Sequence, residues 1–84
     1  GILIFFYSKE HEPIHVHAKK GEFESKAEFY IVNGVISEIQ VTDIKGAKPL
    51  TGKDLKDFRV FLEVYAEQIV EKWINYFIYH ISIQ

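Results

Sequence analysis

The sequence predicts an α+β domain, in which a four-stranded, mainly antiparallel β-meander packs on one face against one long C-terminal helix. The first 41 residues consist of short apolar or alternating runs divided by turn residues. Residues 53–79 instead repeat apolar side chains at helical spacing, with no Gly or Pro among them. A length of 84 residues suits a single domain, 1–84. We divide it into a meander (1–41), a loop (42–50), a helix (51–79) and a tail (80–84).

The composition excludes several classes of protein. Hydrophobic residues make up 48% of the chain, which is too apolar for disorder and predicts a homo-oligomer, most simply a dimer. A net charge of −2 provides no basic excess for a phosphate backbone, which disfavours nucleic acid as a partner. No apolar run is long enough to span a membrane. The absence of Cys excludes disulfides and thiolate metal sites and favours a cytoplasmic location. The absence of Met predicts a native start upstream of Gly1.

The first half of the chain supplies the strands. Residues 2–7 form a continuous apolar run that is typical of a buried strand. After Pro13, the segment 14–19 alternates, with Ile14 and its even-numbered neighbours on one face and the histidines on the other. A two-residue turn at Lys20-Gly21 would then place Lys19 opposite Glu22 and His17 opposite Glu24.

A second hairpin is predicted at Asn33-Gly34, since both residues tolerate a positive φ. The strand that follows, 35–41, does not keep its phase. A two-residue turn sends Ile36 toward the core, whereas the pattern favours Ile39 and Val41 there. We expect a β-bulge to shift the phase. The alternative is an apolar patch on the outer face that serves as an interface.

Thr51 is the expected N-cap of the helix. If the helix is straight, it is about 40 Å long, whereas a six-residue strand is only about 20 Å long. The C-terminal end of the helix would then extend beyond the sheet, and its apolar side chains would need a partner surface. The apolar stripe, widened by Phe61, comprises Leu55, Phe58, Leu62, Tyr65, Ile69, Trp73 and Tyr76. The sheet face expected to meet it bears Ile14, Val16, Ala18, Phe23, Ala27, Phe29 and Ile31.

The segment 10–17, Glu-His-Glu-Pro-Ile-His-Val-His, holds three of the four histidines. His15 and His17 share a strand face, so both imidazoles could meet one ion, with His11 joining from the loop. Glu24 could complete the set, and Glu10 and Pro13 would support it. Such a set suits a Zn-like divalent transition metal, and an open position would allow hydrolysis or nuclease chemistry. The alternative is a polar face, directed away from the core, on which the histidines pair with Glu22 or Glu24.

The sequence resembles the small bacterial proteins of the domain of unknown function 4160 family. The resemblance lies in the order of its parts: a strand, the motif acid-His-x-Pro-x-His-apolar-His, a hairpin and a terminal helix. The resemblance runs from Gly1–Tyr7 through the motif to the helical segment 61–73, which ends at Trp73. Glu10, Ile14 and Val16 stand where that family typically has Asp, Pro and Phe. Phe61 and Tyr65 stand where it often has Trp and His. The resemblance implies the fold more than a function, and it implies a small protein partner in the manner of a toxin–antitoxin-like gene pair.

No catalytic residue is identified by the sequence. The favoured function is that of a non-enzymatic binding or regulatory module, with a homodimer preferred to a small protein partner. The alternative is a metal-binding protein, or a metal-dependent hydrolase or nuclease, that uses the histidine cluster.

Overall fold

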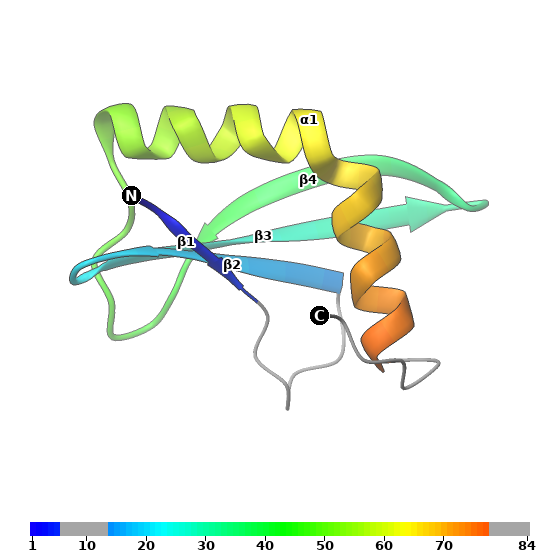
Figure 1. The fold of residues 1–84 in the computed structure, drawn as a ribbon, viewed down its shortest axis with the longest axis horizontal. Coiled ribbons are helices and arrows are strands. Elements are labelled where there is room, and N and C mark those ends of the chain that lie inside the picture. The colour runs from blue at the N-terminus through cyan, green and yellow to red at the C-terminus, as the bar shows by residue number, and fades with distance from the viewer. Residues whose placement is uncertain (6–13, 78–84) are drawn as a thin grey trace.

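The computed structural model describes residues 1–5 and 14–77. One antiparallel sheet contains, in spatial order, β1 (Leu3–Phe5), β2 (Ile14–Lys20), β3 (Phe23–Val32) and β4 (Val35–Asp43). A single long helix, α1 (Gly52–Phe77), follows the sheet and packs on one of its faces (Figure 1). The predicted fold class, an antiparallel meander with one C-terminal helix, is confirmed.

The element boundaries differ slightly from those expected. The meander continues to Asp43, two residues beyond the predicted end, and α1 begins at Gly52, directly after the expected N-cap, Thr51. The carbonyl of Thr51 accepts the first bond of the helix, from the Leu55 amide at 3.3 Å, as an N-cap residue should. The last expected residues of the helix and the tail 80–84 lie outside the described residues.

The first hairpin turn is displaced by one residue from its predicted place. Lys20 pairs with Phe23, so the two loop residues are Gly21 and Glu22, and Gly21 has a φ of 62°. Glycine is favoured at this first central position of a type II′ turn, because other residues resist a positive φ there. The prediction of a turn at Lys20-Gly21 was therefore wrong, and every cross-strand partner shifts by two positions.

The second hairpin turns at Asn33-Gly34 as predicted, with φ angles of 52° and 78°. These values fit a type I′ turn. The ladder then skips one residue, because Ile31 pairs with Ile36 and Tyr30 pairs with Glu38. Ser37 is the extra residue of this bulge.

The bulge explains the conflicting phase of β4. Before Ser37, Ile36 faces the core; after it, Ile39 and Val41 do so, opposite Phe29 and Ala27. The expectation of a phase-shifting bulge is confirmed.

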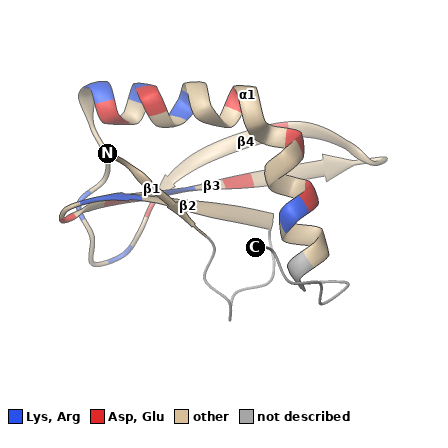
Figure 2. Ribbon diagram, in the orientation of Figure 1, with Lys and Arg blue, Asp and Glu red and all other residues tan. Residues whose placement is uncertain are grey.

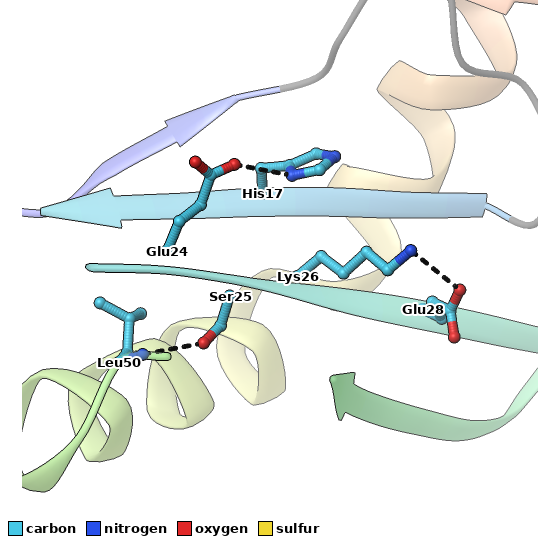
Figure 3. Close-up of polar contacts among 6 residues, drawn as sticks. All are labelled: His17, Glu24, Ser25, Lys26, Glu28 and Leu50. Carbon is cyan, nitrogen blue, oxygen red and sulfur yellow. Dashed lines mark hydrogen bonds and ion pairs between the residues drawn. The ribbon is translucent and has the colours of Figure 1, made fainter. Parts of the chain in front are cut away.

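The loop between β4 and α1 is hydrogen-bonded to the start of β3. The Glu24 amide donates to the Lys48 carbonyl at 2.7 Å, and the Leu50 amide donates to the buried Ser25 hydroxyl at 2.9 Å. These bonds satisfy backbone donors that burial removes from water. They hold the first turn of α1 against the sheet, on the side opposite the histidines (Figure 3).

The core lies between α1 and one face of the sheet. Val16 and Phe29 are each 2% exposed, and Phe58 of α1 is 1% exposed. The buried cluster comprises Val16, Ala18, Ala27, Phe29, Leu50, Phe58, Leu62 and Ile69. Two residues predicted for this sheet face, Phe23 and Ile31, are 36% and 38% exposed, because they lie near the ends of β3, away from the centre of the cluster.

The helix departs from the expected straight rod. Its 26 residues would span about 39 Å if straight, which exceeds the longest dimension of the molecule, 34 Å. Figure 1 shows that α1 turns partway along its length, and its second half descends beside the end of the sheet. Residues 53–77 contain no Gly or Pro, so the bend is not caused by a helix-breaking residue.

Tyr65 was wrongly assigned to the buried stripe and is 45% exposed. The stripe passes from Leu62 to Ala66 and then Ile69, steps of four and three residues that stay on one face. Tyr65 lies to the side of this face and contacts the ring of Phe61, with ring centroids 4.9 Å apart. The side chain of Tyr76 is not among those that the structure describes.

Within the described residues, no helix is both long enough and apolar enough to cross a membrane.

Candidate functional site

The histidine face of the sheet is the one turned away from the core cluster. Strand alternation places Val16 under α1 and both His15 and His17 on the other face, with ring centroids 5.3 Å apart. His11, Glu10 and Pro13, the other predicted members of the site, lie outside the described residues. The structure places His15 beside His17, and it places Glu24 beside His17 as well.

These histidines are buried, with exposures of 6% and 3% for His15 and His17. The sequence predicted a polar face directed away from the core, and it did not predict that this face is buried. In the described part of the chain, β1 contributes to the cover, because Phe5 pairs with His17 across the strands and stacks on its ring at 5.5 Å. Burial of this face makes the polar contacts of each imidazole energetically important.

The pairing of His17 with Glu24 is present, although not in the predicted register. Lys26 is the residue directly opposite His17, and Glu24 is its diagonal neighbour. Glu24 reaches across nevertheless, and its Oε2 lies 3.2 Å from Nδ1 of His17 (Figure 3). Glu24 is itself buried, so the contact replaces water for both groups. Glu22, the other suggested partner of the histidines, is exposed, and its Oε1 lies 3.6 Å from Nζ of Lys48.

Further along β3, charged groups continue across the same face. Nζ of Lys26 lies 3.7 Å from Oε2 of Glu28, and the Tyr30 hydroxyl donates a hydrogen bond to Oε1 of Glu28 at 3.2 Å. Partial removal from water raises the pKa of the Tyr30 hydroxyl, and the nearby Glu28 carboxylate adds to this shift. The phenol is therefore neutral and acts as a donor at ordinary pH.

The contact between His17 and Glu24 has a chemical consequence. When Nδ1 of His17 carries the proton and donates it to the carboxylate, the lone pair of the ring is on Nε2. This is the arrangement by which carboxylates orient metal-binding imidazoles. Within residues 1–5 and 14–77, no group of three His, Asp or Glu side chains is arranged to hold a metal ion. A metal centre on this face would therefore need a ligand from outside these residues, and His11 is the candidate that the sequence predicts.

A second candidate site lies on the other side of the molecule, where the second half of α1 faces the β3–β4 hairpin. A groove of about 910 Å³ opens there. We call it the hairpin groove. Its apolar lining includes Ile14, Ile31, Val35, Ile36, Val64 and Val70. Val35 is 66% exposed and Val64 is 61% exposed, so the groove presents apolar surface to solvent.

Acidic residues accompany this apolar surface. Glu63, Glu67 and Glu71 line the groove from α1, at intervals of four residues. That interval places them on one stripe of the helix. Sequence reasoning missed this site, although the repeated Glu beside Val64 was a visible signal, because only the structure places the hairpin opposite the helix.

Comparison with known proteins identifies the family. No curated protein and no solved structure matches the chain. The model of one family, described as Domain of unknown function (DUF4160), matches residues 1–74. That match extends from the first strand to the residue after Trp73, across the whole sheet and nearly all of α1. The chain therefore belongs to the DUF4160 family.

Proposed function

We propose that the protein is a non-enzymatic binding module, and that a partner chain docks in the hairpin groove. The observation that carries this proposal is the open apolar lining of the groove, in which Val35 and Val64 are each more than half exposed. Contiguous exposed apolar surface is unfavourable in water and is typical of interaction sites.

Two occupants of the groove are compatible with the sequence. The apolar composition favours a second copy of the chain. The resemblance of the histidine segment to its family favours a small protein partner, as in a toxin–antitoxin-like gene pair. Either occupant would remove Val35 and Val64 from water, which is the free-energy gain that drives docking.

The proposal is tested by photo-crosslinking in cells that express the protein. A benzophenone amino acid in place of Val64 should form a covalent product with one defined chain, because Val64 lines the groove. The same amino acid in place of Lys56, an exposed residue of α1 outside the groove lining, is the matched control. Mass spectrometry then identifies the crosslinked chain as a second copy or another protein. Equal product at both positions would reject the groove as a binding surface.

A metal site on the histidine face is the second candidate function. It is supported by the position of His15 and His17 on one face of the sheet, with ring centroids 5.3 Å apart, and by the carboxylate of Glu24 at Nδ1 of His17. His11 would supply a third imidazole, and Zn is the ion that such a set suits best. If an exchangeable position remained on the ion, hydrolysis would be the corresponding chemistry.

Metal analysis of untagged protein tests this second candidate. We expect about one equivalent of a divalent transition metal per chain, falling below about one tenth in His15→Ala and His17→Ala, since each substitution removes a ligand. Lys19→Ala, an exposed substitution on the same strand, should leave the content unchanged. Wild-type protein that stays below one tenth after incubation with Zn²⁺ would reject the metal site.

A further inference from the structure

We infer that the occupant of the hairpin groove is a basic amphipathic helix from a partner protein, rather than a second copy of this chain. This inference rests on the proposed function and adds the chemistry of the partner. It depends on the charge of the groove, on the spacing of its carboxylates and on the location of the basic residues in this chain.

The charge of the groove is of one sign. Its lining contains three carboxylates, those of Glu63, Glu67 and Glu71, and no Lys or Arg among the described residues. The ion pairs found within the described ranges involve other residues, so none of these three carboxylates is neutralised there. Lys72 is next to Glu71 in the chain but is not part of the lining. A partner with Lys or Arg would meet this charge favourably.

The spacing of the carboxylates selects a helix. Residues four apart on α1 are about 6 Å apart along its axis. A second helix that lies along the second half of α1 (Figure 1) can present Lys or Arg at the same interval to Glu67 and Glu71. Apolar side chains on its adjacent face would then reach Val64, Val35 and Ile31, as in other helix-in-groove complexes.

A second copy fits this surface poorly. In a two-fold dimer the same surface meets itself, so the Glu63–Glu71 stripes would approach each other as like charges. Apart from Lys72 on the second half of α1, which is not part of the groove lining, Figure 2 shows the Lys and Arg residues of the described chain near the β2–β3 turn, in the loop before α1 and on the first half of α1. Contact between that region and the groove of another copy would be head-to-tail, and would continue into an open chain of molecules unless the rotation closed a ring.

The test uses a designed peptide of about 18 residues, an amphipathic helix of Leu and Lys with Lys at every fourth position along the flank. A matched peptide carries Glu in place of each Lys. We expect the Lys peptide to bind the folded protein at least about tenfold more tightly, and to weaken several-fold between about 50 and 500 mM salt. Fluorescence anisotropy measures both effects.

The second part of the test reverses the charge of the groove. The triple variant Glu63→Lys, Glu67→Lys, Glu71→Lys should reverse the preference between the two peptides. The control variant Glu22→Lys, Asp43→Lys, Asp57→Lys changes net charge equally, at exposed residues outside the groove lining, and should keep the wild-type preference. Circular dichroism confirms that both variants are folded.

The outcomes separate this inference from the proposed function. Equal binding of the two peptides, or an equal effect of the two triple variants, overturns the basic-helix inference. A crosslink from position 64 to a second copy overturns it also, while the binding function stands. If position 64 gives no specific crosslink and neither peptide binds, both proposals fall.

Discussion

Replacing Phe58 by alanine is expected to lower the free energy of unfolding by about 3–5 kcal/mol. Phe58 is 1% exposed and packs within the cluster formed by Val16, Ala27, Phe29 and Leu50. Removal of the ring loses its transfer free energy and leaves a cavity that neighbouring side chains fill only in part. A domain of this size has a total stability of about 4–13 kcal/mol, so the variant should be partly or largely unfolded.

Urea unfolding followed by circular dichroism measures the effect of Phe58→Ala. Val60→Ala is the control, because Val60 is on the same helix and is 50% exposed. The control should change the free energy of unfolding by less than about 1 kcal/mol. A loss below about 1 kcal/mol for Phe58→Ala would contradict the placement of this ring between α1 and the sheet.

The second large effect is expected at the buried contact between Glu24 and His17. Glu24→Ala should cost about 2–3 kcal/mol, because it leaves the His17 ring, 3% exposed, without the carboxylate at its Nδ1. Glu24→Gln retains an oxygen that can accept from Nδ1, so it should cost about 1 kcal/mol or less.

Two measurements test this contact. Urea unfolding at pH 7 gives the free energies of the two Glu24 variants. The ¹⁵N spectrum of the His17 ring shows which nitrogen carries the proton, and Nδ1–H is expected in the wild type. Equal stability of Glu24→Ala and the wild type would contradict a structural role for the carboxylate.

Strand alternation was the most informative feature of the sequence. It correctly placed Val16 and Ala18 under the helix and both histidines on the opposite face. The turn at Asn33-Gly34 and the bulge in β4 were also predictable, because only a phase shift brings Ile36, Ile39 and Val41 to one face. These features depend on local sequence and on a period of two.

Features that depend on distant contacts were not predictable. The burial of His15 and His17 needs cover that lies beyond β2 itself, to which Phe5 of β1 contributes. The first turn was misplaced because Lys20-Gly21 and Gly21-Glu22 both provide a glycine, and only the full ladder selects between them. The hairpin groove lies between the β3–β4 hairpin and α1, and no Gly or Pro in residues 53–77 signals the bend of that helix (Figure 1).

Binding at the hairpin groove can be observed residue by residue. The most direct test is an NMR titration of the ¹⁵N-labelled protein with the Lys-containing helical peptide. If the peptide binds in the groove, amide shifts should concentrate at Ile31, Val35, Val64 and Glu67, and residues of the β2–β3 turn should stay unchanged. Shifts that concentrate at the β2–β3 turn, or no shifts at saturating peptide, would contradict binding in the groove.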